Sequence, residues 1–429
     1  MNPTVSIPSP ETSETDHHSR LSLVQRFCRQ AVLESFELLS AGHLEIMLPD
    51  GTIRNFGRET DRDPARIRVT NERFFQRCVK AGDIGFGEAY VDGDWETDDI
   101  TGVISWFLLN AENSPTISGS KAGSWKLNLF KFANRLSHLL RRNSKEGSRE
   151  NIHEHYDLGN EFYSLWLDQT MSYSSGIFTS ADQSMEDAQF EKYDALCRQL
   201  KLTEDSHVLE IGCGWGGLAE HAVKNYGSRV TGVTISQEQF DFARQRFVDQ
   251  GIADRIELQL RDYRDISGTY DRIVSIEMLE AVGEDYYDTF FAKCDSLLKP
   301  NGLMSLQYIT CPDSRFDELK RGVDWIQKHI FPGSLLPSIS RVSGSLNRTG
   351  DLFLHHLSDI GNSYAQTLKL WRMEFNTQLE RVAALGFDDE FVRKWNYYLA
   401  YCEAAFATRN ISVVQATYTR PNNRTLFAL

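Results

Sequence analysis

The sequence predicts an α/β protein in which a doubly wound parallel sheet follows a smaller α+β domain. One reason is residues 208–217, Val-Leu-Glu-Ile-Gly-Cys-Gly-Trp-Gly-Gly, where an apolar strand leads into a glycine-rich turn and then a helical segment. The other is the alternation of helix-like and strand-like segments from residue 185 to residue 309. Such alternation indicates a parallel sheet, whose ligands gather at the carboxyl ends of its strands.

Composition narrows the class of protein. The chain has 429 residues, which is enough for two domains, and its net charge of −14 argues against nucleic-acid binding. Its seven cysteines show neither metal-binding spacing nor a disulfide framework, so we expect free thiols and no metal. No apolar run reaches the roughly 18 residues of a spanning helix, and no signal peptide is evident. We therefore expect a cytoplasmic protein that touches membranes only peripherally.

The N-terminal part is expected to be a disordered start at residues 1–20 and a small α+β domain at residues 21–118. Apolar residues recur at helical spacing over residues 21–41. Residues 43–56 alternate around Pro49, Asp50 and Gly51, which is typical of a hairpin, and residues 65–70 form another strand-like run. A helix is expected over residues 71–80, ahead of the phrase Gly-Phe-Gly-Glu-Ala-Tyr-Val-Asp-Gly-Asp-Trp at residues 85–95.

A basic segment follows at residues 119–150 and differs from the acidic remainder of the chain. Between Lys121 and Lys145 seven lysines and arginines have no acidic counterpart, and aromatic and aliphatic residues interleave with them. A basic amphipathic helix of this kind is typical of a membrane-surface segment. The alternative is a linker helix packed on the acidic body of the protein.

The catalytic domain is expected over residues 151–429. A helix at residues 185–200 leads into the strand that begins at His207, and the next strand covers residues 229–233. Further strands are expected at residues 256–260 and 271–276, with helices at 238–250 and 286–298. Residues 299–302 are expected to turn into a strand over residues 303–309.

The glycine-rich turn points to a nucleotide-like ligand. Gly212 and Gly214 allow a tight turn and a close approach of the backbone, and the following helix offers free N–H groups. A nicotinamide or flavin site would place an acid at the end of the next strand to hold a ribose. Here that strand ends in Thr234, Ile235 and Ser236, with Gln239 one helical turn later.

These two motifs together resemble the cyclopropane fatty acid synthase family, over residues 154–420. Its members are S-adenosylmethionine-dependent enzymes of the class I methyltransferase fold that methylate carbon at the double bond of lipid acyl chains. The resemblance implies that the cofactor is S-adenosylmethionine. It also implies the following cofactor-binding residues: Tyr173, Ser174, Gly212, Cys213, Gly214, Thr234, Ile235, Gln239, Asp262, Tyr263 and Ile276.

The resemblance extends to the N-terminal domain. Residues 85–95 resemble the small domain that precedes the catalytic domain in longer members of the family, which is similar to sterol-carrier folds. The implied roles are lipid presentation or formation of a homodimer, and the alternative is a structural cap.

The family holds a bicarbonate that takes up the proton after methyl transfer, and the resemblance assigns its ligands here. Glu280, Ile309 and Tyr364 match the family pattern. Ser175 stands in place of a cysteine and Gln307 in place of a histidine. Both replacements can still donate hydrogen bonds to an anion, but neither ionises near neutral pH.

The expected function is transfer of the methyl group to the double bond of unsaturated phospholipid acyl chains, with cyclopropane fatty acids as the product. Three alternatives stay open. The same C-methylation could give methylene- or methyl-branched chains, the protein could be a small-molecule N-methyltransferase, or it could bind lipid without catalysis.

Overall fold

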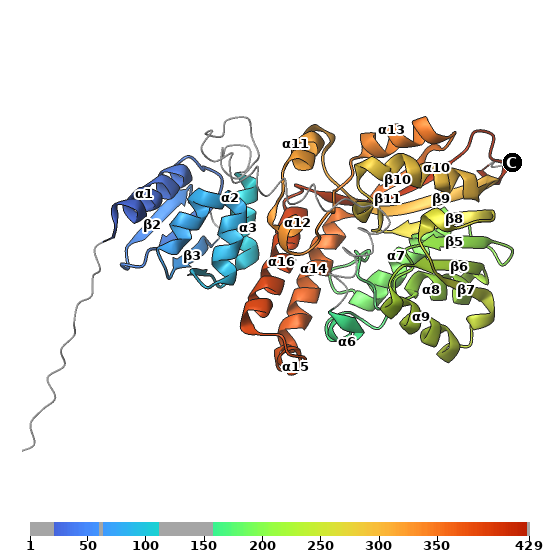
Figure 1. Cartoon of the computed structure of the whole chain (residues 1–429), viewed down its shortest axis with the longest axis horizontal. Coiled ribbons are helices and arrows are strands. Elements are labelled where there is room, and N and C mark those ends of the chain that lie inside the picture. Colours follow the sequence, from blue (N-terminus) through green and yellow to red (C-terminus); the bar gives the residue numbers. More distant parts are fainter. Residues whose placement is uncertain (1–20, 60–62, 111–157, 427–429) are drawn as a thin grey trace, which may run out of the picture.

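The computed structural model describes residues 21–59, 63–110 and 158–426, which form two sheets with their covering helices (Figure 1). The predicted basic segment at residues 119–150 lies outside the described residues. The N-terminal part consists of α1 (Leu23–Glu37), β1 (His43–Met47), β2 (Ile53–Gly57), β3 (Ala65–Val69), α2 (Arg73–Val91), β4 (Trp95–Glu96) and α3 (Ile100–Leu109).

The small sheet has the order β2-β1-β3-β4, with β1 antiparallel to β2 and parallel to β3. Its first hairpin turns at residues 48–52, as the Pro-Asp-Gly sequence predicts. The core beneath it is aromatic, with Phe36 packed edge-on against Phe56 at 5.8 Å and Phe86 tilted over Trp95 at 4.5 Å. Likeness of this domain to sterol-carrier folds stays a prediction.

Helix α2 differs from the prediction, because it continues beyond residue 80 to Val91. It kinks at Gly82, where φ is 58° and ψ is −127°. The two glycines after the kink allow close packing: a Cβ at Gly85 would lie 2.1 Å from the Arg77 carbonyl, and one at Gly87 would lie 2.5 Å from the Trp325 ring. The glycines that obscure the helical pattern are therefore the residues that let the helix pack closely.

The large sheet has seven strands in the order β10-β11-β9-β8-β5-β6-β7. The five strands from β9 to β7 are parallel, while β11 is antiparallel to both of its neighbours. This is the doubly wound arrangement that the sequence predicts. The strands are β5 (His207–Ile211), β6 (Arg229–Thr234), β7 (Ile256–Leu260), β8 (Tyr270–Ile276), β9 (Leu298–Thr310), β10 (Phe353–Asp359) and β11 (Ser412–Thr419).

Helices cover both faces of this sheet because alternate strand residues are apolar on both sides. Val208 packs with α7, α8 and α9 on one face, whereas its neighbour Leu209 packs with α10 and α13 on the other. The helices of this part are α6 (Gly159–Tyr163), α7 (Met185–Gln199), α8 (Gly217–Tyr226), α9 (Gln237–Asp249), α10 (Tyr287–Leu297), α11 (Phe316–Arg321), α12 (Trp325–His329), α13 (Ile339–Thr349), α14 (Gly361–Thr377), α15 (Leu379–Ala384) and α16 (Asp389–Ala407).

Strand β9 corrects one sequence expectation. Residues 299–302 do not form a separate turn, because the strand already begins at Leu298. The pairing with β8 shifts there: Tyr270 faces Leu298, but Arg272 faces Leu303. A bulge thus takes up the extra residues within the strand.

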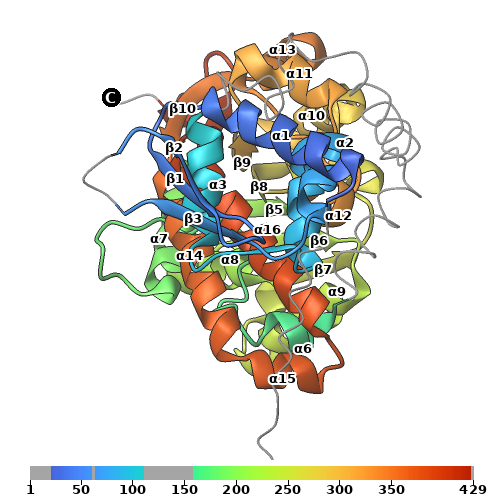
Figure 2. The same cartoon turned by 90° about the vertical axis from the view of Figure 1, so that its left-hand side faces the viewer.

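The two parts of the chain meet along α16, which packs against both α3 and α2 (Figures 1 and 2). Polar bonds cross this contact: Glu403, which pairs with Arg372 of α14 at 3.0 Å, accepts from Thr101 of α3 at 3.0 Å. Arg393 donates through Nε to the carbonyl of Tyr90 at 2.8 Å. Within the described residues, no helix is both long and apolar enough to span a bilayer.

Candidate active site

The glycine-rich turn after β5 leaves open space where the sequence predicts a ligand. Gly212 and Gly214 have φ of +78° and +52°, so both are in the left-handed region that favours glycine. The N–H groups of Gly212 and Cys213 both donate to the carbonyl of Val233, at 2.9 and 3.0 Å. A Cβ built at Gly214 would meet nothing within 4 Å. The turn can therefore receive a ligand against its backbone, as the predicted cofactor requires.

Cys213 lies within this turn as a buried thiol. Burial raises the pKa of the thiol well above its ordinary value. None of the seven cysteines is in a disulfide, as the sequence predicts.

The end of β6 carries an uncharged polar pair. The Thr234 hydroxyl donates to Oε1 of Gln239 at 2.8 Å and accepts from the N–H of Ser236 at 3.1 Å. The Ser236 hydroxyl in turn accepts from the N–H of Gln239, which caps α9. Ile235 is half-buried beside them. The predicted residues are thus together at one strand end.

Asp262 and Tyr263 follow β7, and Ile276 ends β8 half-buried. Arg264 donates to Asp262 through Nε at 2.8 Å and through Nη2 at 2.7 Å, so this carboxylate already has a counter-ion. The Tyr263 ring lies edge-on to Phe290 at 5.4 Å, with the Arg264 guanidinium 5.3 Å from its centroid.

Tyr173 and Ser174 lie in the loop between α6 and α7, against an aromatic cluster. The Tyr173 ring is 5.6 Å from Trp166 and 5.4 Å from Trp371, and its hydroxyl is 2.8 Å from that of Tyr398. The Ser174 hydroxyl accepts from the buried ammonium of Lys192 at 2.8 Å. This cluster gives the loop an aromatic surface beside the strand ends.

Glu277 is the centre of the site, and the sequence analysis missed it. Its Oε1 accepts from Gln307 Nε2 and from the backbone N–H of Ser175, each at 2.9 Å. Its Oε2 accepts from the Tyr364 hydroxyl at 2.6 Å. Three of the residues that the resemblance assigned to a bicarbonate therefore donate to a carboxylate of the chain itself.

Ser175 contributes to the site differently from the prediction. Its hydroxyl donates to the carbonyl of Gly176 at 2.9 Å, so only its backbone N–H faces the carboxylate. The expected anion-binding side chain is therefore turned away.

Glu280 and Ile309 form a separate pair beside this centre. The N–H of Ile309 donates to Oε1 of Glu280, while Oε2 is buried and has no hydrogen-bond partner among the described residues. Burial, and secondly the charge of Glu277, raises the pKa of Glu280 to about 8. Burial also raises the pKa of Glu277, against the effect of its three donors.

These residues do not fit a bicarbonate between them. The donors of Ser175, Gln307 and Tyr364 are already taken by Glu277, so an added anion would have to displace this carboxylate and would meet its negative charge. One sequence feature could have drawn attention to Glu277, namely that it is the first residue after β8, where polar residues of a doubly wound fold meet their ligands.

Behind Glu277, side-chain amides form a glutamine chain, defined here as the buried Gln307 and Gln415 and the half-buried Gln199. Gln415 donates through Nε2 to Gln307 Oε1 at 3.0 Å, and Gln199 donates through Nε2 to Gln415 Oε1 at 3.0 Å. Thr417 then donates to Gln199 Oε1 at 2.9 Å. The chain joins α7 to β9 and β11 behind the site.

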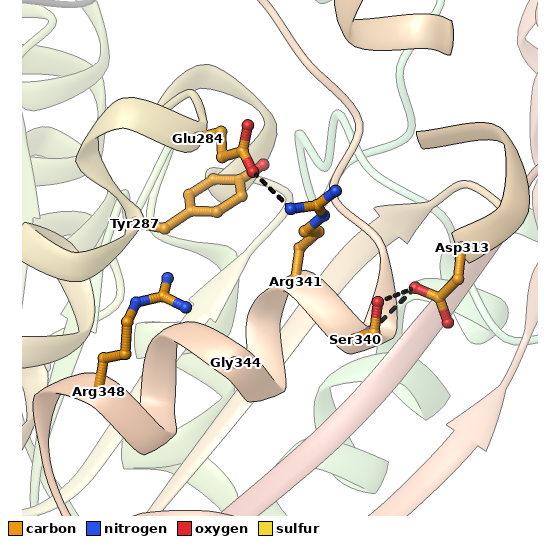
Figure 3. Close-up of a pocket in the computed structure, with 7 residues that line it drawn as sticks. All are labelled: Glu284, Tyr287, Asp313, Ser340, Arg341, Gly344 and Arg348. Carbon is orange, nitrogen blue, oxygen red and sulfur yellow. Dashed lines mark hydrogen bonds and ion pairs between the residues drawn. The ribbon is translucent and has the colours of Figure 1, made fainter. Parts of the chain in front are cut away.

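A surface pocket of roughly 280 Å³ lies between α10 and α13, apart from these residues (Figure 3). Arg341 pairs there with Glu284 at 3.5 Å, and Asp313 accepts from the Ser340 hydroxyl at 2.6 Å. None of the predicted site residues lines this pocket. Asp313, close in sequence to the site, thus holds the start of α13. In the part of the chain that the structure describes, no group of three or more His, Cys, Asp or Glu residues is placed to hold a metal ion.

Comparison with known proteins agrees with this arrangement. The family model described as "Mycolic acid cyclopropane synthetase" matches residues 143–416. Tuberculostearic acid methyltransferase UfaA1 of Mycobacterium tuberculosis is 35% identical over 401 residues, 89% of each chain. Cyclopropane-fatty-acyl-phospholipid synthase of Escherichia coli strain K12 is 37% identical over 358 residues, 83% of this chain and 88% of the relative.

The fold agrees as well. The solved structure of mycolic acid cyclopropane synthase CmaA1, complexed with SAH and CTAB, has a TM-score of 0.59 at 30% identity and covers 63% of this chain and 98% of that one. The enzyme is therefore a methyltransferase that uses S-adenosylmethionine, and the chain belongs to the cyclopropane synthase family.

Proposed function

We propose that this enzyme transfers the methyl group of S-adenosylmethionine to the double bond of an unsaturated phospholipid acyl chain, and that Glu277 removes the proton that follows. The observation that carries the proposal is the carboxylate of Glu277, held by three donors between β8, β9 and α14. The E. coli relative is named a cyclopropane-fatty-acyl-phospholipid synthase, which supports the substrate class.

When bound, S-adenosylmethionine supplies a methyl group on a positively charged sulfur; the π electrons of the alkene form the new carbon–carbon bond as the sulfur–carbon bond breaks. The chain's own residues then handle a carbocation. The rings of Tyr173, Trp166 and Trp371 keep water away from it. Glu277 carries the opposite charge and accepts the proton, and the electron pair of the broken C–H bond stays on carbon.

That electron pair decides between two products. If it closes a bond across the former alkene, the product is a cyclopropane, the outcome that the sequence favours. If a hydride first shifts from the methylated carbon to the neighbouring cationic carbon, the pair instead forms a double bond to the transferred carbon. The product then carries a methylene branch, which a separate hydride donor and a proton would reduce to a methyl branch.

Of these two products, we propose the methylene-branched chain as the main one. The chain departs from the family's bicarbonate ligands at Ser175 and Gln307, and it fills their centre with Glu277. A relative that matches 89% of this chain is named a tuberculostearic acid methyltransferase. The cyclopropane is the second candidate, supported by the E. coli relative.

The test is product analysis with purified enzyme, labelled S-adenosylmethionine and vesicles of monounsaturated phospholipid. We expect a methylated acyl chain, with the methylene branch as the main product by mass spectrometry, and the same rate in CO₂-free buffer as in bicarbonate. Methylation of an amine substrate with no lipid product would overturn the proposal. A ring product would leave the methyl transfer standing and reverse the order of the two products.

The variant Glu277→Gly tests whether Glu277 is the base. The backbone of Glu277 has φ of +48°, and glycine accepts that conformation without strain. We expect activity to fall by at least about 100-fold, the usual contribution of a positioned base. Added bicarbonate should restore part of it by entering the space that the side chain leaves. A variant with undiminished activity would exclude Glu277 as the base.

We also propose that the enzyme meets its substrate at the membrane surface through the basic segment between Lys121 and Lys145, which lies outside the described residues. Each basic residue near an anionic surface contributes roughly 1 kcal/mol. Changing Lys126, Lys131 and Arg135 to Glu should weaken binding to anionic vesicles, most at low salt, while activity on detergent-dispersed lipid is kept. Unchanged vesicle binding would favour the linker-helix alternative.

A further inference from the structure

A buried ammonium group, that of Lys192, lies beside Ser174 and the carboxylate of Glu277. Lys192 is on α7, its side chain is fully buried, and its Nζ donates to the Ser174 hydroxyl at 2.8 Å. The same Nζ lies 4.4 Å from the centroid of the Tyr193 ring. A lysine buried this completely needs negative charge nearby, because it has lost the solvation of water.

That negative charge comes from three directions. Glu277 follows β8, Glu210 is on β5 and Asp168 lies in the loop after α6; each favours the charged form of Lys192, while burial lowers the pKa of Lys192 to about 8. Glu210 has no hydrogen-bond partner for its buried Oε2 among the described residues, and burial raises its pKa to about 8. Lys192 is thus the cation shared by these carboxyl groups.

The backbone of Lys192 is tied to the same centre. Its carbonyl accepts from Gln415 Nε2 at 3.3 Å, the amide that also donates to Gln307. Gln307 in turn donates to Glu277. A movement of α7 would therefore be felt at Glu277 through both the charge and the glutamine chain.

We propose that Lys192 is a positioning residue for methyl transfer, which keeps Glu277 ionised and fixes the hydroxyl of Ser174. The inference rests on the proposed function, since it assumes that Glu277 accepts the proton. Only the ionised carboxylate can do so, and burial favours the neutral form. The hydrogen bonds from Tyr364, Gln307 and the Ser175 N–H oppose this effect of burial, and so does the positive charge of Lys192.

The experiment compares pH–rate profiles on vesicles of monounsaturated phospholipid. Lys192→Gln keeps a donor for Ser174 but removes the charge; Lys192→Met removes both. In the wild type the rate falls on the acidic side as Glu277 takes up a proton. We expect both variants to move this acidic limb to higher pH by about one unit or more. At a fixed pH below the limb, each unit of this shift lowers the rate about tenfold.

Ser174→Ala separates the two contributions, because it removes the hydrogen bond and leaves the ammonium; its acidic limb should stay in place. Lys224→Met, on the exposed side of α8, is the control for a general effect of losing a lysine and should match the wild type. Thermal melting establishes whether each variant is folded. If Lys192→Met does not fold, the comparison of wild type with Lys192→Gln is sufficient.

An unmoved acidic limb in a folded Lys192→Gln variant would overturn the inference. So would a limb that moves equally in Ser174→Ala, because the hydrogen bond alone would then explain it. Absence of a methylated lipid from the wild type is a different result, which would remove the proposed function first.

Discussion

At the scale of single residues, Glu277 combines a strained backbone with a fully bonded carboxylate. Its φ of +48° is uncommon for a residue with a side chain, and such conformations cost about 1–3 kcal/mol. Its own N–H donates to the carbonyl of Gln307 at 2.7 Å, and its side chain accepts from the amide of the same residue at 2.9 Å. These bonds fix the turn after β8 and orient the carboxylate toward the strand ends.

The open space at Gly214 leads to a prediction about the cofactor. Gly214→Val puts a branched side chain where the ligand should approach, although the protein itself has no atom there to clash with. We expect affinity for S-adenosylmethionine to fall by at least about tenfold, or about 1.4 kcal/mol, in calorimetric titration. Gly251→Val is the matched control, since Gly251 also has positive φ and nothing within 4 Å, but lies in a surface turn after α9. Equal losses in both would mean that backbone strain, not the site, explains the effect.

The raised pKa of Glu280 predicts how its replacement depends on pH. Between its ordinary value of 4.5 and about 8, the folded chain holds a proton that the unfolded chain has released. Stability attributable to this group is therefore lost as pH rises through that window. Glu280→Gln cannot ionise, so its melting temperature relative to the wild type should rise by about 2 °C or more between pH 5 and pH 9, corresponding to about 1 kcal/mol.

Differential scanning fluorimetry at both pH values measures this change, with the exposed Glu257→Gln as a control that should show no such trend. A difference from the wild type that is constant with pH would contradict the buried, proton-binding character of Glu280.

At the scale of elements, α14 fastens the loop that carries Tyr173 to Ser175. Thr367 accepts from the N–H of Gly176 at 3.1 Å, and Ser363 accepts from the N–H of Phe178 at 3.1 Å. Tyr364, on the same helix face, donates to Glu277. Residues at spacings of three and four share a face of a helix, so α14 holds both the loop and the carboxylate.

Thr367→Val tests this fastening, because valine has the same shape and lacks the acceptor. The buried N–H of Gly176 is then unsatisfied, at a cost of about 1–3 kcal/mol. We expect a lower melting temperature and a fall in kcat/KM of about tenfold, measured with the lipid assay. Thr377→Val, at the exposed end of α14, should change neither. Full activity in Thr367→Val would show that the loop is held by other contacts.

Individual elements also show where the sequence was informative. The ends of β5, β6, β7 and β8 follow from apolar runs and turn residues, which are local features, so the sequence could place residues at those ends; that these residues bind the cofactor stays a prediction. Glu277 was missed because its importance arises from pairing across strands with Gln307 and from the distant Tyr364. The orientation of the Ser175 hydroxyl depends on a rotamer, which no spacing in the sequence reveals.

At the scale of the whole molecule, the two parts of the chain share one interface rather than only a connecting segment. Gly87 of α2 lies so close to α12 and α16 that a Cβ would come within 2.5 Å of the Trp325 ring and 2.8 Å of the Tyr397 ring. The partly buried pair of Arg372 and Glu403 bonds to Thr101 of the N-terminal part. Motions of the N-terminal part are therefore coupled to α14 and α16, and through them to Tyr364.

Gly87→Ala should loosen this interface. Overpacking of this kind costs about 1–3 kcal/mol, so we expect the onset of unfolding to move to lower temperature in calorimetry and the N-terminal part to unfold first. Gly344→Ala, inside α13, is the control: its Cβ would meet only the flexible end of Arg348 at 3.4 Å, and the change should stabilise by about 0.5–1 kcal/mol. Equal stability of the two variants would mean that the contact at Gly87 is not tight in solution.

The glutamine chain has one further consequence, which concerns the direction of its dipoles. Thr417, Gln199, Gln415 and Gln307 each donate to the next member, and the last donates to Glu277. All of these dipoles therefore present their positive ends toward the carboxylate. Reversing one amide would set two acceptors or two donors against each other, so the members can reverse only together. The charge of one carboxylate thereby fixes the polarity of a row of side chains behind it, and each neutralisation of Glu277 weakens the preference for that polarity along the whole row.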